Sequence, residues 1–564
     1  MFNKAAEKTS ALTILIGAPL TTIFLLTSSV TDPVNETKLF VAGGFGFALF
    51  FLVVGFQLKA SLSNFRFYWI FSGLFLLTSL NAVIASDSPL SQNLYGSFGR
   101  NTGFITYLIL TLAGVGLLGI REKSNFKKLV TGLQIAGVIN VVYCAWVIAF
   151  GDFLSWNNPY GNILGLFGNP DFISAFLGMF VSTLLAFIAD ARATWRYRII
   201  ATLIALIAFY EIVDSHAIQG IVVTALGIGI VGFFFVRAHI KHIALTYLYV
   251  FAGLAMGFLA VMGALQKGPF SFIYKTSVSL RGAYWNAGAT MGREHPLTGV
   301  GMDSYGDWYR RARSLKAATI LPGPKTISNA SHNVIMDFFA YGGWPLLLSY
   351  IALISLTGVA VVRVILRSRK YEPIFVAMAA AWICYVAQAI ISINQIGLAI
   401  WGWLLTGALV SYEFVTRPGN DSKSPTPKSS NRSKSNSGII SPQLIAGLGV
   451  LVGSLVAVPP LAADMKWRTA LDSKDANKVL AALEPSYLNP NDSQRLAQAV
   501  QIFGTSNLLS QAHEVALKGV KFNPNYFDAW KILYFLQNST PAEKAEALQN
   551  MKRLDPLNPD VTAQ

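Results

Sequence analysis

The chain has 564 residues, of which 53% are hydrophobic and only 13% are charged. That charged fraction is about half of the ~25% typical of soluble proteins, so the composition excludes an ordinary soluble globular protein. The formal net charge of +16 does not indicate nucleic-acid binding, because residues 460–564 are neutral, with eleven Lys/Arg and eleven Asp/Glu, and the excess lies in loops of the apolar region. Cys144 and Cys384 stand alone in apolar runs and predict neither a disulfide framework nor a metal site.

Thirteen apolar stretches are long enough to cross the ~30 Å hydrocarbon core of a bilayer as helices. We therefore expect an all-α, polytopic membrane protein. The first stretch has no cleavage signature, which favours a retained helix over a signal peptide. The predicted spans are 11–30, 39–58, 67–84, 103–119, 129–150, 171–189, 198–213, 217–236, 243–263, 333–362, 373–392, 396–415 and 439–459.

The distribution of positive charge predicts the orientation. With a cytoplasmic N-terminus, the cytoplasmic segments hold 22 Lys/Arg and the short outer loops hold only Lys38 and Arg100. The long hydrophilic segment 264–332 then faces outward, with nine Lys/Arg against three Asp/Glu. Such a segment beside a bilayer is suited to hold an anion near the lipid headgroups.

Four regions are predicted along the chain. Residues 1–415 form a twelve-span membrane domain, and the Ser/Lys/Pro-rich residues 416–438 form a disordered cytoplasmic linker. Residues 439–459 are the thirteenth transmembrane helix, which carries residues 460–564 out of the cytoplasm.

The tail, residues 460–564, contains a repeated motif. Leu488–Asn491, Phe522–Asn525 and Leu554–Leu557 recur at spacings of 34 and 32 residues. This period is typical of tetratricopeptide-like helical repeats. Two interpretations stay open: a concave surface for a protein partner, or a helical cap packed on the membrane domain.

Ionisable side chains are rare inside the predicted spans. Glu211, Asp337 and Glu413 lie near span ends, whereas ion-coupled carriers keep such groups near the bilayer midplane. This argues against coupled transport. Polar residues instead collect at the outer ends of the spans and in the long loop: Arg100, the loop 157–169, His216, Gln219, Arg281, Arg293, His295, Arg310, Arg311, Arg313 and His332. Taken singly, an arginine at such a place usually extends its side chain to lipid phosphates.

Several short motifs, in their order along residues 95–410, resemble those of the O-antigen ligase and O-antigen polymerase superfamily. The motifs are Gly99–Gly103, Phe167–Phe172, Arg281–Trp285, His295–Gly301, Ser331–Asn333 and Gly342–Gly343. The resemblance implies a helical, metal-independent glycosyltransferase of the C type that needs no cofactor. Such an enzyme takes a glycan from a polyprenyl diphosphate carrier such as undecaprenyl diphosphate. It joins the glycan to a hydroxyl of a glycan, lipid or protein acceptor at the outer face of the inner membrane, during cell-envelope polysaccharide assembly.

Family roles transfer to matching positions only. Arg281 matches the loop arginine that binds the diphosphate, and His332 matches the histidine that acts as a base or orients the acceptor. A second family arginine, in Ser-Arg-Gly at the start of a span, is replaced here by His216. Either His216 or Gln219 substitutes for it, or Arg100 supplies the missing charge. In the loop, Arg310 and Arg311 are further candidates for substrate binding.

The chemistry of these residue types agrees with that role. The planar arginine fork suits phosphate oxygens, and no Asp-x-Asp pair exists in the chain to favour a divalent metal. A histidine with a pKa near ~6.5 can accept the proton of an acceptor hydroxyl. Asp303, Glu211 and Asp214 are reserve candidates for that base. The loop aromatics either stack on sugar rings or, as we favour, belong to the interfacial belt; they are Tyr284, Trp285, Tyr305, Trp308 and Tyr309.

Two rival functions are a flippase or transporter for polysaccharide or lipid carrier, and an envelope scaffold that acts through the repeat tail. Ligase and polymerase share one chemistry and differ only in the acceptor. The sugar, the acceptor and the oligomeric state stay open at this point.

Overall fold

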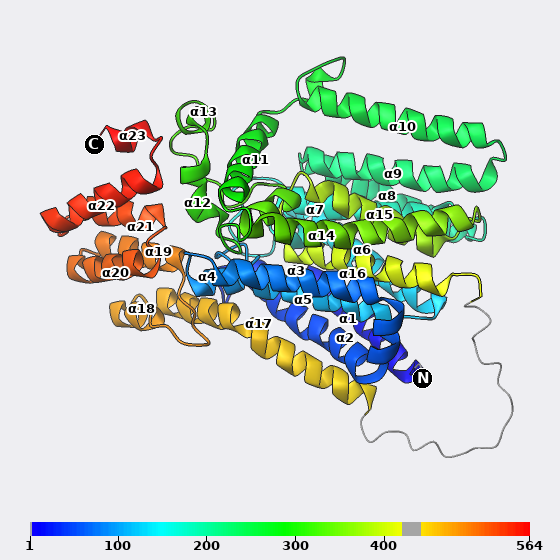
Figure 1. Ribbon diagram of the computed structural model, residues 1–564, viewed down its shortest axis with the longest axis horizontal. Helices are drawn as coiled ribbons and strands as arrows, with labels where there is room; N and C mark the ends of the chain where they lie inside the picture. The colour runs from blue at the N-terminus through cyan, green and yellow to red at the C-terminus, as the bar shows by residue number, and fades with distance from the viewer. Residues whose placement is uncertain (1–2, 420–440, 564) are drawn as a thin grey trace.

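The computed structural model describes residues 3–419 and 441–563. Apart from one isolated bridge between Ser486 and Asn489, all regular secondary structure in these ranges is helical. A bundle of long apolar helices makes up most of the molecule, and a smaller group of helices closes the chain at one end of the bundle (Figure 1). The predicted all-helical, polytopic class is confirmed.

Each predicted span overlaps one helix of the bundle. Nine helices of the described ranges are long and apolar enough to cross a membrane, and α5 and α15 are shorter apolar helices. The count of thirteen spans stays a prediction, and the predicted linker falls mainly on residues 420–440, outside the described residues. The bundle helices are α1 (Lys4–Ile23), α2 (Asn35–Asn64), α3 (Arg66–Ile84), α5 (Phe104–Gly116), α6 (Lys123–Phe150), α7 (Pro170–Ile188), α8 (Trp195–Asp214), α9 (Ile218–His239), α10 (Ile243–Ala264), α14 (Val334–Arg367), α15 (Pro373–Ala389), α16 (Ile396–Val415) and α17 (Pro442–Ser473).

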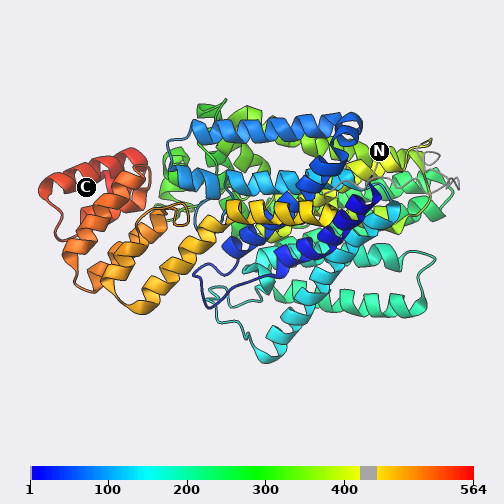
Figure 2. The ribbon, with the colours of Figure 1, turned by 90° about the horizontal axis from the view of Figure 1, so that it is seen from below.

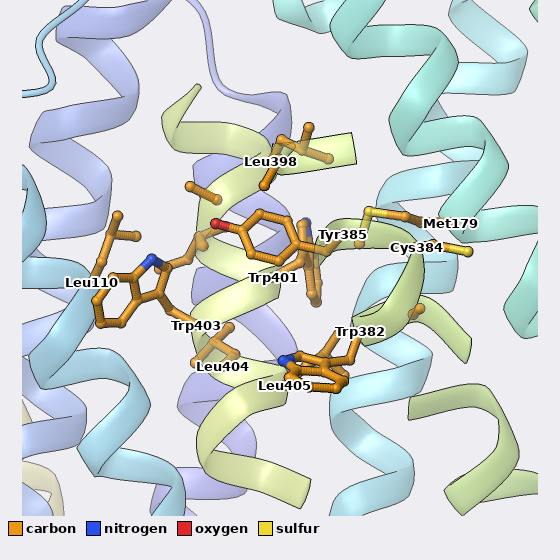
Figure 3. Packing of buried hydrophobic residues seen from close by; sticks show 14 of the residues in the cluster. Leu110, Met179, Trp382, Cys384, Tyr385, Leu398, Trp401, Trp403, Leu404 and Leu405 are labelled. Carbon is orange, nitrogen blue, oxygen red and sulfur yellow. The ribbon is translucent and has the colours of Figure 1, made fainter. Parts of the chain in front are cut away.

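Helix α16 lies at the centre of the bundle. In its most apolar window 89% of the residues are buried. Trp401 and Trp403 of this helix lie beside Tyr385 of α15 in the core (Figure 3). The indole N–H of Trp401 donates to the hydroxyl of Thr22 at 2.8 Å, so its polar edge is satisfied within the core. Helix α10 is the opposite case, because only 6% of its most apolar window is buried, as is typical of a lipid-facing helix.

Short elements cover the end of the bundle that faces the tail. Helix α11 packs against α14, and α12 packs against both α11 and α14 (Figure 1). These elements follow α10 in the long loop, and they position the candidate site. The short elements at this end are α4 (Leu90–Tyr95), η2 (Gly165–Phe167), η3 (Ser271–Ile273), α11 (Thr276–Glu294), α12 (Tyr305–Ala312) and α13 (Leu315–Thr319), whereas η1 (Leu117–Gly119) lies at the other end, near the start of α1.

Helix α14 is interrupted at Gly342 and Gly343, where the backbone leaves the helical conformation. The motif segment 295–301 lies against this break. The Pro296 carbonyl accepts a hydrogen bond from the Trp344 N–H at 2.9 Å, and two N–H groups near the end of the segment donate to the carbonyls just before the break at 2.9 and 3.1 Å. Because backbone groups left free in a membrane are costly, the motif stabilises the break by pairing with it.

The tail is joined to the bundle by one long helix. Helix α17 packs along α2 and continues past it into the tail, so the predicted boundary after residue 459 lies inside this helix. The buried carboxylate of Asp464 accepts hydrogen bonds from the backbone N–H groups of Thr31 and Asp32 at 2.7 and 2.8 Å, which fixes α17 to the loop between α1 and α2. The tail helices that follow are α18 (Ala476–Ala482), α19 (Ser493–Thr505), α20 (Leu509–Phe522), α21 (Phe527–Phe535), α22 (Pro541–Leu554) and α23 (Pro559–Thr562).

Helices α19 and α20 pack as one pair, and α21 and α22 as another (Figure 2). Two turns of the repeated motif contact α12. The buried Asp555 accepts hydrogen bonds from Arg313 at 2.7 and 2.9 Å and from Arg310 at 3.0 Å. At the equivalent motif position, the Asn523 amide donates to Asp307 at 3.2 Å. The tail therefore packs on the membrane domain as a cap, while its assignment to tetratricopeptide repeats stays a prediction.

Replacing Gly343 by Ala should destabilise the fold. An added Cβ would lie 2.3 Å from the Pro296 carbonyl oxygen, at a φ of +63° that L-residues rarely adopt. Thermal melting of the purified protein should show a loss of more than about 2 kcal/mol. Gly282→Ala is the matched control, because its Cβ would meet open space within α11. Equal melting temperatures for the two variants would contradict the role given to the break.

Replacing Asp555 by Ala should loosen the tail. The change leaves two arginines without their carboxylate partner, and breaking a buried ion pair costs about 3–5 kcal/mol. Pulse proteolysis of the full chain should show earlier cleavage within the tail. Asp472→Ala removes only an exposed pair with Arg468 one helical turn away, so its effect should stay near about 0.3–0.5 kcal/mol. A similar loss in both variants would contradict the role of Asp555 in holding the tail.

Candidate functional site

His332 lies just before α14 and has a φ of +57°, a left-handed conformation that is uncommon for a residue with a side chain. Its neighbours fix this geometry. The N–H and hydroxyl of Ser331 donate to Asp337 at 2.7 and 2.6 Å, and the side chain of Asn333 caps α14. The imidazole stacks on the ring of Tyr284, with centroids 5.5 Å apart and planes 28° apart. The ring of His332 is therefore held in one orientation by a local network.

Arg281 lies on α11, three residues before Tyr284, so both side chains share one face of that helix. Its guanidinium is 3.8 Å from the carboxylate of Asp171, a loose ion pair to the first turn of α7. Its Nε is buried and has no hydrogen-bond partner among the described residues. A buried donor without a partner is costly and is typical of a site that binds a further group.

Arg100 comes from the loop 96–103, before α5. Its Nη2 donates to the side-chain oxygen of Asn329 at 2.6 Å. The loop is held by Asp303, whose carboxylate accepts a hydrogen bond from the Ser97 N–H at 2.8 Å. Asp303 is itself in the left-handed region, with a φ of +52°. The carboxylate thus positions the arginine loop, and this explains its burial better than the reserve role of a base that we considered from the sequence.

The electrostatics of the site keep His332 uncharged. Burial, together with the positive charges of Arg100 and Arg281, lowers the pKa of His332 to about 3. Burial also raises the pKa of Asp303 to about 6, although hydrogen bonds to the carboxylate and the charge of Arg100 lower it. A neutral imidazole therefore lies within the influence of two cationic side chains.

Two cavities meet at Arg100. The first, which we call the loop cavity, has a volume of about 550 Å³ and lies between the α1–α2 loop, the Gly99–Arg100 turn and the α6–α7 loop. The second, the tail cavity, has a volume of about 320 Å³ and lies between the long loop and the tail. Both fall in or near the ~300–1,000 Å³ range of small-molecule sites. Side chains that line the tail cavity include Arg100, Tyr284, Arg310, His332, Gln494, Tyr526 and Asp528.

The two loop arginines named as substrate-binding candidates are engaged by the protein itself. Arg310 pairs with Asp555 and lies 4.1 Å from the ring centroid of Phe527, although it also reaches the wall of the tail cavity. Arg311 stacks on Trp308 at 3.6 Å. Burial lowers the pKa of Arg311 to about 10. Their role in substrate binding stays a prediction, and the contacts give both a packing role.

The residues considered as replacements for the second family arginine lie elsewhere. His216 is exposed, with a φ of +56°, and its carbonyl accepts a hydrogen bond from Lys275 at 3.5 Å. Gln219 is buried and donates to Gln388 of α15 at 3.0 Å. Neither side chain lines the two cavities. Of the three alternatives, only Arg100 reaches the surroundings of His332.

Several residues of the site were not identified from the sequence as members of it. Asp171 faces Arg281, and Asn329 holds Arg100. Tyr284 was assigned to the interfacial belt but stacks on His332. Its three-residue spacing from Arg281 on a helix was the available signal, and Asp171 lies within the Phe167–Phe172 motif. Asn329 has no sequence signal, because nothing in its own stretch marks it.

Metal ligands do not gather in the described part of the chain: no group of three or more His, Cys, Asp or Glu could hold an ion there. The positive charge at the site comes from arginine side chains. Independence from metals stays a prediction.

One part of the chain matches a known protein family. Residues 203–351 match the family model described as O-antigen ligase. The matched range contains both Arg281 and His332, and it runs from α8 into α14. A search of curated proteins found no match. The chain thus contains an O-antigen ligase domain, which supports the O-antigen ligase superfamily and a general function in glycan transfer, and its long apolar helices are those of a multi-pass membrane protein.

Proposed function

We propose that this protein transfers a glycan from a polyprenyl diphosphate carrier to an acceptor hydroxyl at the outer face of the plasma membrane. One observation carries the proposal: Arg100 and Arg281 both lie close enough to His332 for their charges to lower its pKa, and Arg100 lines both cavities. A cationic pair, a neutral imidazole and two adjoining cavities are the parts that such a transfer needs.

The arginines would hold the diphosphate. Negative charge grows on the leaving diphosphate as its bond to the anomeric carbon breaks, and fixed cations at that charge are usually the largest catalytic contribution. The guanidinium fork suits phosphate oxygens better than a point charge does. The free Nε of Arg281 and its long 3.8 Å contact with Asp171 leave donors for this purpose. In this arrangement the donor glycan occupies the loop cavity and the acceptor occupies the tail cavity.

His332 would act on the acceptor. Its neutral imidazole takes the proton of the acceptor hydroxyl, the hydroxyl oxygen forms a bond to the anomeric carbon, and the electrons of the broken C–O bond leave with the polyprenyl diphosphate. A diphosphate bound between Arg100 and Arg281 offsets their charges, so the pKa of His332 rises from its value of about 3 in the free protein. Donor binding would therefore make the base stronger when it is needed.

Two observations support the orientation that we propose. Helix α1 begins at the end of the bundle opposite the tail (Figures 1 and 2). Residues of α17 or of the tail line both cavities, so the cavities lie at the other end. Positive charge in the loops favours a cytoplasmic N-terminus. The 264–332 loop, the tail and the site then face the outside.

Arg281→Ala and His332→Asn should each reduce glycan transfer by at least about a hundredfold. Asn tolerates the left-handed backbone of His332, so this variant keeps the fold while it removes the base. The assay uses sealed right-side-out vesicles, the native lipid-linked glycan and a membrane-impermeant acceptor. The control is Arg293→Ala, on the same helix, whose exposed side chain bonds only within α11. Full activity of Arg281→Ala or His332→Asn, or transfer only in inverted vesicles, would contradict the proposal.

The pH dependence of transfer should reveal the two states of His332. In the free protein the imidazole is neutral, so kcat/KM for the donor should stay constant between about pH 5 and 8. The acidic decline of kcat, which reports the donor complex, should lie about one pH unit or more higher than that of kcat/KM. Burial raises the pKa of Asp303 to about 6. A decline of kcat/KM below about pH 6 would therefore identify Asp303 as the base instead.

A further inference from the structure

The far wall of the tail cavity is made by the C-terminal helices. Asp492, Ser493 and Gln494 reach it from the start of α19, and Tyr526, Phe527 and Asp528 reach it from the start of α21. The near wall carries His332 and Arg100. The tail therefore closes the cavity into which the proposed base faces.

The position of this wall relative to His332 is fixed by buried contacts around the cavity. Asp555 binds Arg310 and Arg313 on one side, and the carboxylate of Glu36 pairs with Arg495 at 3.3 Å on another. Broken buried ion pairs are costly, so these contacts hold the wall and the long loop as one site. A tail that served only to bind other proteins would not need to be locked to the catalytic loop in this way.

The tail side chains suit sugar hydroxyls. Asp528 is one-third exposed, and its only ion pair among the described residues is a long 3.8 Å contact with Arg310, whose charge is already paired with Asp555 at 3.0 Å. Its carboxylate oxygens can therefore accept hydrogen bonds from a ligand. Tyr526 offers an aromatic face with a polar tip, and Gln494 offers an amide. A carboxylate, an amide and an aromatic ring around one cavity match an uncharged saccharide better than an apolar lipid chain.

We propose that the tail is the acceptor-binding half of the active site, and that Tyr526 and Asp528 determine which saccharide acceptor is used. This inference rests on the proposed function, because it places the acceptor hydroxyl beside His332. Exchange of the tail among related chains would then change the acceptor while the diphosphate site at Arg281 stays the same.

The test measures binding and transfer separately, with the full chain in nanodiscs. The probe is the oligosaccharide released by mild acid from the lipid-linked glycan of the source cells. Asp528→Asn and Tyr526→Ala should weaken its binding, and raise the acceptor KM, by about tenfold, since each loses a ligand hydrogen bond or a stacking face. Tyr526→Phe keeps the ring, so it should retain most of the affinity. The matched control is Glu484→Gln, an exposed tail carboxylate that pairs with Lys518 away from the cavity.

The outcomes separate this inference from the proposed function. Unchanged saccharide affinity in Asp528→Asn and Tyr526→Ala, while Arg281→Ala abolishes transfer, overturns the tail's role and leaves the transfer reaction standing. No binding of the saccharide by the wild-type chain, or binding of a serine-containing peptide in its place, also overturns the inference. Saccharide binding that depends on Asp528, in a chain without transfer activity, supports the tail site and refutes the proposed function. Thermal melting of each full-chain variant checks that its tail is folded.

Discussion

Two arginine side chains held near a half-buried, uncharged imidazole are the constraint on which the rest of this structure depends. Like charges repel, and removal of a cation from water is costly, so Arg100 and Arg281 stay close to His332 only because other groups hold them there. Arg281 has only a loose partner in Asp171. An anion placed between the arginines would relieve both the repulsion and the unpaired buried donor. This is why we propose a diphosphate as the ligand of the site, and why we expect the donor to change the basicity of His332.

The residues around the site serve mainly to hold it. Asp303 secures the loop that carries Arg100, and Asp337 secures the turn that carries His332. The motif 295–301 pairs with the broken backbone of α14 and so fixes α11 above the start of that helix. Both Asp303 and His332 adopt left-handed backbone conformations, which a protein keeps only where the surroundings determine them. The geometry of the site is thus built into the fold before any substrate arrives.

The tail is also held in place by contacts with the rest of the chain. It is joined to the bundle by α17 and locked to α12 through Asp555, Arg310 and Arg313. The loop arginines therefore assemble two parts of one chain instead of extending to lipid phosphates. The helical cap carries polar and aromatic side chains into the cavity beside His332. Under the proposed function, this wall can differ in chemistry without disturbing the diphosphate-binding arginines.

Sequence alone predicted the helical membrane class, the approximate position of the long helices that the structure describes, and the resemblance to the O-antigen ligase superfamily, because apolar length and short motifs are local properties of the chain. It also named Arg281 and His332 as site candidates, a prediction on which the proposed function depends. It did not identify Asp171, Asn329 or Tyr284 as members of the site. It named Arg310 and Arg311 as candidates for substrate binding, but it did not reveal that Arg310 pairs with Asp555 and that Arg311 stacks on Trp308. Only the tertiary structure decided which of the many outer polar residues meet, since a charged side chain has the same local pattern whether it binds a ligand, a lipid phosphate or a buried aspartate 242 residues away, as Arg313 does.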